Sequence, residues 1–512
     1  MNGDLDLWEG SQPPPVPKLT LRPYQLAAVQ ALREVLKLGI MRVILSSPTG
    51  SGKTEMGFEI IRGAKSKGRK VAFIANRVHL VDQTCRRLAV AGFSFGVIQG
   101  QNTRRPDADV LVCSIQTLQR RGMPEDVDLL VIDEAHACAG TEAYRDVMKG
   151  KPVIGLTATP YSKGLGKVYP QLGGALFERV VIAARIEDLI TQGFLVSADV
   201  WAPSEPDLTG VKVTAGDYNE KDLGEAVDKA ALIGDIVAHW FKLAHNTPTV
   251  VFATNISHSK HIVEQFRGAG VAAEHIDCYT KDEDRIAILA RVASGQTMVI
   301  SNVGILAEGW DFPACKTLIL ARPTKSLIRY LQMAGRVLRP FPGKDKALIL
   351  DHSGVVRRLG FPWGYFGQSL DDGKPKKSSG DVKEKPEPLP KACPHCHYMK
   401  PPKTPICPSC GFEATRPNEI EAEEGELVPL TKVSKGVKGL EEIGRTQVFH
   451  QLLWIERERG YKTRWADNQY KNAFGCYPNG ISKDVEEPCG PVLSWVRSRQ
   501  IAWAKSKMRG AA

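Results

Sequence analysis

A glycine-rich loop at 46–54, with the residues SSPTGSGKT in order, carries the clearest chemistry in this chain. It follows an apolar run at 42–45 and precedes a segment able to form a helix from Glu55. A strand, a glycine-rich loop and a helix N-terminus cradle nucleotide phosphates, because the backbone N–H groups of the loop point at phosphate oxygens. The alternative is an ordinary Gly/Ser turn with a chance lysine, and the usual pattern has glycine where this chain has Ser47. The residues that we predict to bind ATP phosphates are Thr49, Gly50, Ser51, Gly52, Lys53 and Thr54, with Thr54 also at Mg²⁺.

A pair of carboxylates follows another apolar run, at 129–132. Asp133 lies where a strand would end beside the phosphate loop, so we predict that it holds Mg²⁺. Glu134 would act as general base on the attacking water. His136 would couple this site to a neighbouring lobe. Acidic pairs are common at strand ends, and the functional interpretation depends on the phosphate loop upstream.

Two arginines near 332–339 are candidates for stabilising the charge that builds up during phosphoryl transfer. Arg336 and Arg339 are three residues apart, so on a helix they would share a face. A solvated basic helix face is the alternative. We predict that both arginines reach into the ATP cleft from a second lobe.

Four cysteines form two C-x-x-C pairs ten residues apart, Cys393 with Cys396 and Cys407 with Cys410. Four thiolates at this spacing can close a tetrahedral Zn²⁺ site, which leaves no open coordination position and is therefore structural. A redox-active pair is the alternative. His395 and His397 are interpreted as surface residues.

The elements that would position these residues are two series of apolar runs. The near-continuous apolar character of each run indicates parallel sheets that are covered on both faces, and hence two α/β lobes of similar size. The predicted strands lie at 71–75, 110–113, 129–132 and 153–156 in the first lobe and at 249–253, 298–301, 317–320 and 347–350 in the second. The predicted ranges are a tail at 1–18, an ATP-binding lobe at 19–200, a connection at 201–227, a second lobe at 228–365, a linker at 366–391, a zinc module at 392–414 and a helical module at 440–512.

Composition narrows the class of protein. The formal net charge is +11, which favours a polyanionic partner without requiring one. We expect no secretory signal and no transmembrane helix, because the first ten residues are acidic and no apolar run is long enough. The eleven cysteines are not spaced as a disulfide scaffold, which favours a reducing compartment such as the cytoplasm of a bacterium or a phage-infected host.

Six motifs in order give the chain a resemblance to superfamily 2 helicases over about two-thirds of its length. The motifs that carry it are 21–25 (LRPYQ), the phosphate loop, 133–136 (DEAH), 157–160 (TATP), 302–313 (NVGILAEGWDFP) and 332–339 (QMAGRVLR). That family often has Ala or Ser where this chain has Ser47. The strings at 308–313 and 322–326 resemble bacterial and phage DNA-repair helicases of the RadD type, which also have a zinc module after the second lobe.

The resemblance implies two tandem RecA-like lobes with ATP and Mg²⁺ bound between them. It further implies nucleotide contacts by Arg22, Gln25, Gly309, Asp311 and Gln332, and coupling of ATP state to lobe closure by Thr157 and Thr159 together with His136. A nucleic-acid strand crosses both lobes in this family, and its candidate contacts are Arg77, Gln83, Gln116, Thr117, Thr254 and Asn302.

We therefore predict an ATP-dependent helicase or translocase that acts on DNA in repair, recombination or replication. RNA as the substrate stays open, as does a remodelling or annealing motor without processive unwinding. A zinc-dependent DNA-binding adaptor with a vestigial ATPase is the alternative from another class. In the last module, Trp465, Tyr470 and Phe474 predict a small helical core more readily than a base-stacking platform, and Gly460 is expected to end a helix.

Overall fold

The computed structural model describes residues 20–214, 216–244, 246–307, 309–365, 369–374, 388–413, 440 and 442–509, without the side chains of 230–231 and 502–509. The chain divides into two compact units, Met1–Thr415 and Arg416–Ala512. The predicted N-terminal tail, most of the linker at 366–391 and Glu308 of the 302–313 motif lie outside the described residues.

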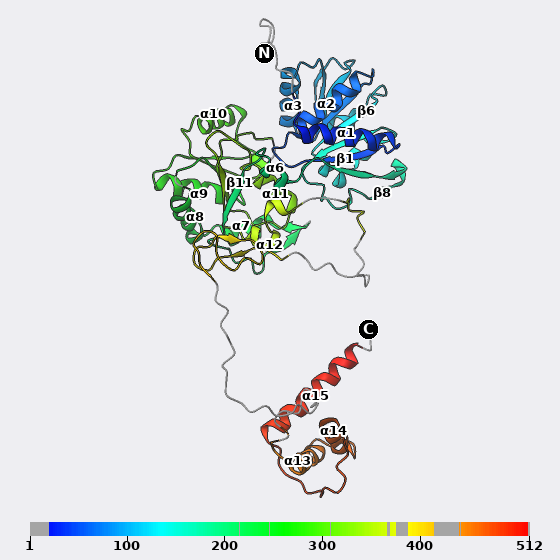
Figure 1. Ribbon diagram of the computed structural model, residues 1–512, viewed down its shortest axis with the longest axis vertical. Helices are drawn as coiled ribbons and strands as arrows, with labels where there is room; N and C mark the ends of the chain where they lie inside the picture. The colour runs from blue at the N-terminus through cyan, green and yellow to red at the C-terminus, as the bar shows by residue number, and fades with distance from the viewer. Residues whose placement is uncertain are drawn as a thin grey trace. The chain divides into compact units, whose positions relative to one another are not determined.

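The first lobe is built on an eight-stranded sheet, coloured blue to cyan in Figure 1. In spatial order its strands are β10 (Arg179–Ile182), β1 (Arg42–Ser46), β7 (Val153–Thr157), β6 (Leu129–Asp133), β2 (Val71–Ala75), β5 (Val110–Ser114), β3 (Gly96–Gln99) and β4 (Asn102–Arg104). Every neighbouring pair is parallel except β3 with β4. The predicted parallel sheet of this lobe is confirmed. Strands β10, β3 and β4 are additions to the prediction, and β10 and β4 form the two edges of the sheet.

Burial on both faces explains the apolar runs. In β2, Val71, Phe73 and Ala75 pack into one cluster, while Ala72 and Ile74 pack into another on the opposite face. The first cluster also contains residues of α1 (Pro23–Lys37), α2 (Lys53–Lys65) and α3 (Val78–Val90). The second contains residues of α4 (Ile115–Arg121), the 3₁₀ turn η1 (Ala135–Gly140) and α5 (Glu142–Met148). Successive side chains of a strand point to opposite faces, so a strand covered twice is apolar throughout.

The second lobe repeats this plan with a six-stranded, wholly parallel sheet. In spatial order its strands are β11 (Ser197–Trp201), β18 (Lys346–Asp351), β17 (Thr317–Leu320), β14 (Thr249–Phe252), β16 (Val299–Asn302) and β15 (Ala273–Ile276). Helices α8 (Ala230–Leu243) and α9 (Ile256–Gly268) cover one face side by side (Figure 1), and α10 (Asp282–Ala293), α11 (Leu327–Ala334) and α12 (Val355–Leu359) contribute to the cluster on the other. Strand β11 belongs to this sheet although its residues fall at the end of the range predicted for the first lobe.

The remaining short elements join or decorate the lobes. They are β8 (Val168–Tyr169), η2 (Pro170–Leu172), β9 (Gly174–Ala175), α6 (Ile186–Thr191), η3 (Ile305–Ala307) and η4 (Pro362–Gly364). The predicted connection at 201–227 contains a hairpin of β12 (Val213–Thr214) and β13 (Asp217–Tyr218), followed by α7 (Glu220–Val227). The side chain of Asn219 caps α7 by accepting hydrogen bonds from the backbone N–H groups of residues 221 and 222.

The cysteine-rich segment packs on the second lobe. Its strands β19 (Lys391–Ala392) and β20 (Met399–Lys400) pair antiparallel. Tyr398 forms an antiparallel bridge with Trp201 at the end of β11, and their rings meet edge to face at 5.0 Å. Met399 is buried in the core of the second lobe. This segment therefore covers the end of an edge strand whose backbone groups would otherwise be unpaired.

The second unit is a small helical module with its own core. It consists of α13 (Arg445–Glu458), α14 (Trp465–Phe474) and α15 (Gly490–Arg509). Tyr470 is buried against Phe449, while Trp465 and Phe474 are half-buried at the margin, so the predicted helical core is present. Helix α13 ends at Glu458, just before Gly460, which has the left-handed φ of 61°.

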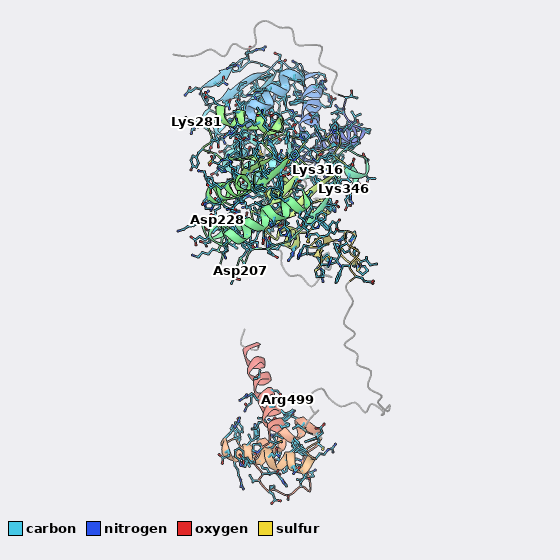
Figure 2. The ribbon with its side chains drawn as sticks, turned by 90° about the vertical axis from the view of Figure 1, so that its left-hand side faces the viewer. Asp207, Asp228, Lys281, Lys316, Lys346 and Arg499 are labelled. Carbon is cyan, nitrogen blue, oxygen red and sulfur yellow. The ribbon has the colours of Figure 1, made fainter. Side chains whose placement is uncertain are left out.

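Charged side chains line the outside of both units. Asp207, Lys281 and Lys346 are exposed on the first unit and Arg499 on the second (Figure 2). Within the described residues, no helix combines the length and apolar character needed to cross a membrane.

The core of the second lobe depends on Trp240, which is fully buried on α8, packs 5.3 Å from Phe266 and donates its indole N–H to Thr249. We expect Trp240→Ala to lower the free energy of unfolding by about 3–5 kcal/mol, because it empties a large packed volume. The neighbouring Phe241→Ala, at a 44% exposed residue, should cost less than about 1 kcal/mol. Urea unfolding followed by far-UV circular dichroism measures both, and equal losses would contradict this packing.

Candidate active site between the two lobes

A cleft of about 440 Å³ lies between the two lobes at the carboxyl ends of their strands. The phosphate loop follows β1, and Asp133 ends β6, so parallel strands bring both to one edge of the first sheet. The residues that line the cleft from the second lobe are Gly309, Trp310, Asp311, Pro313, Arg336, Arg339 and Pro340. The predicted residues that line it are Arg22, Gln25, Thr49, Gly50, Gly52, Lys53, Thr54, Asp133, Glu134, Gly309, Asp311, Arg336 and Arg339.

The backbone of the phosphate loop needs its glycines. Gly50 and Gly52 have φ values of 85° and 81°, which side chains with a Cβ rarely adopt. Ser47 is fully buried, and its hydroxyl lies 2.5 Å from that of Ser51, which donates to the carbonyl of Pro48. The hydroxyl pair closes the loop from inside, which accounts for serine in place of the usual glycine. Ser51 therefore stabilises the loop by its buried side chain and does not line the cleft.

Gln25 is tied to the phosphate loop. Its amide N–H donates to the carbonyl of Ser51 at 2.8 Å, and its side-chain oxygen accepts the backbone N–H of Arg22 at 2.8 Å. Tyr24 donates to the same Ser51 carbonyl at 2.5 Å. The guanidinium of Arg22 stacks 4.6 Å from the ring centre of Phe194. Arg22 and Gln25 line this corner of the cleft, and the amide of Gln25 is already bonded to the backbone of Arg22 and Ser51.

Glu134 and the three coupling residues lie close together. Glu134 has a left-handed backbone, φ 47° and ψ 50°, which separates the end of β6 from η1. The ring Nδ1 of His136 lies 3.3 Å from Glu134, 3.1 Å from the Thr157 hydroxyl and 3.4 Å from that of Thr159. Both threonines are fully buried. The structure therefore brings together the residues that we predict to couple ATP state to lobe position.

The electrostatics separate the two carboxylates. Burial and the neighbouring Glu134 raise the pKa of Asp133 to about 6. Burial would also raise the pKa of Glu134, but Lys53, a hydrogen bond from His136 and the charge of Arg336 outweigh it and lower this pKa to about 2. Glu134 is therefore ionised at neutral pH, and two carboxylates face Lys53 and Arg336 across the cleft.

The prediction that Arg336 and Arg339 share a helix face is wrong. Helix α11 ends at Ala334, so both arginines lie in the turn that follows. Carbonyls of the 302–313 motif hold them there: Arg336 donates to Ala307 at 3.0 Å and to Trp310 at 2.6 Å. Arg339 forms an ion pair with Asp311. Arg336 is buried and the side chain of Arg339 is only 15% exposed, so neither arginine belongs to a solvated basic helix face.

The second lobe approaches the phosphate loop closely at two glycines. A Cβ on Gly50 would lie 3.0 Å from the Arg339 side chain, and a Cβ on Gly335 would lie 2.5 Å from the Cβ of Thr49. A side chain at Gly335 would collide with Thr49, and one at Gly50 would press on Arg339. Arg339 therefore packs directly over the loop that would hold the phosphates.

Several predicted residues lie elsewhere. Gln332 does not line the ATP cleft but a second hollow, together with Arg77 and His136. Gln83, predicted as a nucleic-acid contact, instead lines the ATP cleft and donates to the Gly309 carbonyl at 3.1 Å. Gln83 therefore lies in the cleft where we expected Gln332, and Gln332 lies outside it.

Two further residues that we predicted to contact the nucleic acid are buried inside the second lobe. Thr254 and Asn302 are fully buried, and Asn302 donates to the Val251 carbonyl at 2.8 Å, so neither side chain is exposed to a nucleic-acid strand. Thr117 is also buried and accepts the backbone N–H of residue 100. Gln116 is exposed, donates to the Asn76 carbonyl at 2.7 Å and stays available. Buried polar side chains at strand ends satisfy backbone groups first.

Arg87 is a cleft residue that the sequence did not reveal. It lies on α3, lines the cleft and forms an ion pair with Glu55, another cleft residue, in the first turn of α2. No local motif contains Arg87, and only the packing of α3 against α2 brings it to the phosphate loop.

The four cysteines meet at one point in the described part of the chain. All four Sγ atoms lie within 4.8 Å of one another, with Cys393 to Cys410 at 3.7 Å and Cys396 to Cys407 at 3.6 Å. A tetrahedral ion with bonds of about 2.3 Å to sulfur would separate its ligands by about 3.8 Å. The cluster therefore has the size and donor set of a site for one thiophilic metal ion.

Comparison with known proteins identifies both lobes. Residues 18–162 match the family described as "Type III restriction enzyme, res subunit", and residues 228–340 match "Helicase conserved C-terminal domain". A "51.5 kDa protein" of a Lactococcus phage is 27% identical over 409 residues, which are 78% of this chain and 84% of that protein. The "Putative ATP-dependent helicase IRC3" of Saccharomyces cerevisiae is 29% identical over 65% of this chain, which spans only 52% of that protein.

A solved structure shares the fold. The fragment of "a putative HsdR subunit of a type I restriction enzyme from Vibrio vulnificus YJ016" aligns with a TM-score of 0.51 at 20% identity, over 70% of this chain and 68% of that one. The chain therefore has the fold of two RecA-like lobes, and the second lobe contains a match to a helicase C-terminal domain. The domain matches and the helicase relatives support an ATP-driven nucleic-acid helicase.

The contact between Gly335 and Thr49 gives a steric test of this cleft. Gly335→Ala should displace the second lobe from the phosphate loop by about 1 Å and lower kcat/KM for ATP by up to about 100-fold. Gly234→Ala is the control, because a Cβ there meets nothing within 4 Å. Steady-state ATPase kinetics measure both, and equal values for the two variants would show that the lobes do not meet in this way.

Proposed function

We propose that this chain, which contains the two domains of a superfamily 2 helicase, is an ATP-dependent DNA helicase or translocase of the RadD type that acts in repair, recombination or replication. The observation that carries the proposal is a single cleft in which Lys53, Asp133 and Glu134 of one lobe face Arg336 and Arg339 of the other. Two separate lobes supply the parts of one phosphoryl-transfer site, so ATP binding is linked to lobe closure.

Each residue has a role that follows from its position. Lys53 and the backbone of Gly50 to Thr54 bind the β- and γ-phosphates. Thr54 and Asp133 would hold Mg²⁺, which would supply positive charge to neutralise the phosphates. Glu134, ionised at neutral pH, orients the attacking water and accepts its proton. Arg339, stacked over the phosphate loop, and Arg336 stabilise charge on the transferred phosphoryl group.

Mechanical coupling follows from the same contacts. His136 contacts Glu134, Thr157 and Thr159. A movement of Glu134 on loss of the γ-phosphate would therefore shift the residues at the end of strand β7. Arg336 is bonded to the carbonyls of Ala307 and Trp310, so the 302–313 segment moves with it. Cycles of closure and opening would alternate the grip on a strand and move the protein along it.

DNA is the proposed substrate. The first lobe matches a restriction-enzyme family, and restriction enzymes act on DNA. The net charge of +11 favours binding to the phosphate backbone of DNA or of RNA. An RNA helicase remains the alternative substrate assignment, and a remodelling or annealing motor the alternative mode of action. The complete set of cleft residues argues against an adaptor with a vestigial ATPase. A phage relative supports action in the cytoplasm of a bacterium or a phage-infected host.

The cysteine cluster is proposed to hold one structural Zn²⁺. The separations of 3.6 and 3.7 Å fit the edges of a tetrahedron of thiolates around zinc. All four positions would be occupied by sulfur, so the ion would stabilise the segment that packs on β11 and would have no open site for catalysis.

Removing the phosphate-binding amine or the general base tests the motor. Lys53→Ala and Glu134→Gln should each lower the ATPase rate measured with single-stranded DNA by about 100-fold or more, because each removes part of the transition-state stabilisation. Binding of the strand without nucleotide should persist in both variants. Parallel assays with single-stranded DNA, forked DNA and RNA identify the substrate, and undiminished turnover in both variants would exclude this function.

Zinc is tested by its release. Treatment of the purified chain with a mercurial reagent should release one Zn²⁺ per chain, detected with a colorimetric chelator, and Cys393→Ser should abolish that release. Cys278→Ser is the control, because Cys278 is exposed and lies outside the cluster. A metal-free chain with an intact, cooperative unfolding transition would contradict the proposal.

A further inference from the structure

A second hollow of about 490 Å³ lies between the lobes, apart from the ATP cleft. Arg77 lines it from the first lobe, and Arg322 and Arg329 line it from the second. Glu220 is the acidic residue among its lining residues, and Gly304, which follows β16, forms part of its wall. Three arginines against one glutamate give this hollow a positive potential.

Arg322 has an unused donor in this hollow. Its side chain is only 6% exposed. One Nη donates to the Thr254 carbonyl at 3.3 Å and the other to Glu220 at 2.6 Å, while its Nε has no hydrogen-bond partner within the described structure. The amide nitrogen of Gln332, buried in the wall of the same hollow, also has none. Buried donors without acceptors are costly, so this hollow is suited to a ligand rich in acceptor oxygens.

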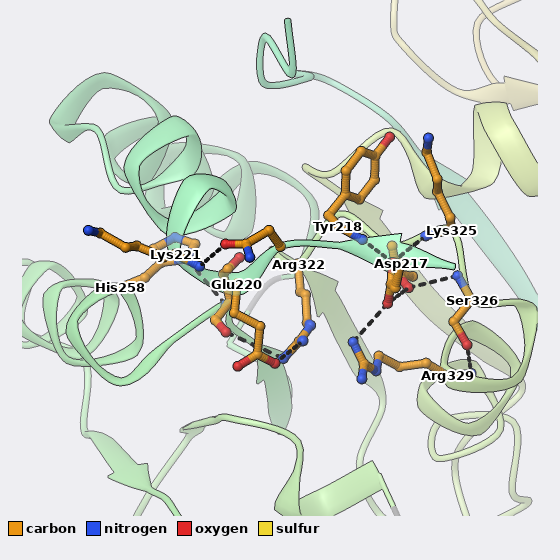
Figure 3. Close-up of polar contacts among 12 residues, drawn as sticks. Asp217, Tyr218, Glu220, Lys221, His258, Arg322, Lys325, Ser326 and Arg329 are labelled. Carbon is orange, nitrogen blue, oxygen red and sulfur yellow. Dashed lines mark hydrogen bonds and ion pairs between the residues drawn. The ribbon is translucent and has the colours of Figure 1, made fainter. Parts of the chain in front are cut away.

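Arg329 is held beside Arg322 by a fixed carboxylate. Asp217 of β13 accepts hydrogen bonds from Arg329 at 2.9 Å, from the Thr324 hydroxyl at 2.8 Å and from the backbone N–H of Lys325 at 2.7 Å. Figure 3 shows Asp217 joined to Lys325 and Arg329, with the guanidinium groups of Arg322 and Arg329 on the same side of β13. Burial lowers the pKa of Arg329, and the charge of Arg322 lowers it further, so the two cations repel each other.

Glu220 differs from Asp217 in its freedom to leave. Its side chain is 67% exposed, it begins α7, and Figure 3 shows it in an ion pair with Arg322. Asp217 is 18% exposed and has several partners. An ion pair whose carboxylate is solvated contributes little free energy, so a stronger anion can displace it. Glu220 is therefore placed as an exchangeable partner of Arg322.

We propose that this hollow binds one backbone phosphate of the nucleic-acid strand through Arg322 and Arg329, and that Glu220 occupies Arg322 until the phosphate displaces it. The inference rests on the proposed function and adds a site and a competing residue to it. Guanidinium groups bind phosphate through paired N–H bonds, which suits a ligand with several acceptor oxygens. Arg77 comes from the opposite lobe, so a phosphate held here would belong to a strand that touches both lobes.

Charge-removing variants of the full-length protein test the site. Arg329→Gln should weaken binding of a fluorescent oligothymidylate of about 20 nucleotides by about ten-fold, because a charge-assisted bond is lost. Its plot of log affinity against log salt should also become shallower by about 0.7. Glu220→Gln should strengthen binding by about two- to five-fold, because the competing carboxylate is gone. Fluorescence anisotropy without nucleotide measures these constants, and oligouridylate forms a parallel arm.

Each variant has a matched control in the same chain. Arg291 is 43% exposed and pairs with the 17% exposed Glu274, much as the 39% exposed Arg329 pairs with Asp217. Glu142 is 73% exposed and pairs with the 16% exposed Arg145, much as Glu220 pairs with Arg322. Arg291→Gln and Glu142→Gln lie outside the lining of the hollow and should leave strand affinity unchanged.

The outcomes separate this inference from the proposed function. If the wild-type chain binds the strand and its ATPase is stimulated, but Arg329→Gln and Glu220→Gln behave like their controls, the phosphate site is wrong and the motor stands. Weaker binding by Glu220→Gln would contradict the claim that Glu220 competes with the phosphate for Arg322. It would show instead that Glu220 positions Arg322 for binding the nucleic-acid strand. If no nucleic acid binds or stimulates the wild-type chain, the proposed function itself fails. Glu220 is exposed, so its replacement tests the inference even if Arg329→Gln unfolds.

Discussion

The close approach of the second lobe to the phosphate loop is the constraint on which the rest of the structure depends. Gly335 leaves no space for a side chain beside Thr49, and Arg339 packs over Gly50. This approach requires α11 to end at Ala334, so that the chain can turn and place Arg336 against the carbonyls of Ala307 and Trp310. The phosphate loop, the 302–313 segment and the turn after α11 are distant in sequence but are held around one cleft. None of them forms a site alone.

The two hollows between the lobes use charge in different ways. In the ATP cleft, the carboxylates of Asp133 and Glu134 face Lys53 and Arg336, an arrangement suited to a metal and a triphosphate. The second hollow has an excess of arginine, moderated by a single exposed carboxylate. His136 lines the second hollow and also contacts Glu134 of the first. One side chain thus lies between the sites proposed for the nucleotide and for the strand.

Local patterns predicted most of the elements that carry the site. Apolar runs of four or five residues marked β1, β2 and β7, because strands that are buried on both faces are apolar along their length. The same reasoning missed the two edge strands of this sheet: β4, which consists of three exposed polar residues, and β10, a short apolar stretch that begins with an exposed arginine. Arginine spacing suggested a helix face at 336–339, but bonds to the 302–313 segment outweighed helix propensity there. Polar residues at the ends of β-strands were predicted to contact nucleic acid, whereas the side chains of Thr254 and Asn302 form hydrogen bonds with buried backbone carbonyls.

The phosphate loop, the carboxylate pair and the cysteine spacing could be predicted from the sequence, because each lies within a few consecutive residues, and two series of short apolar runs predicted the two α/β lobes. Which side chains share a cavity could be learned only from the folded chain. The tertiary structure placed Gln83 in the ATP cleft and Gln332 outside it, brought Arg87 to the phosphate loop, and set Glu220 against Arg322 across about a hundred residues. The physical reason is that a cavity is formed by the packing of helices and strands from two sheets. Their relative positions depend on the summed contacts of the whole core, which no short segment contains.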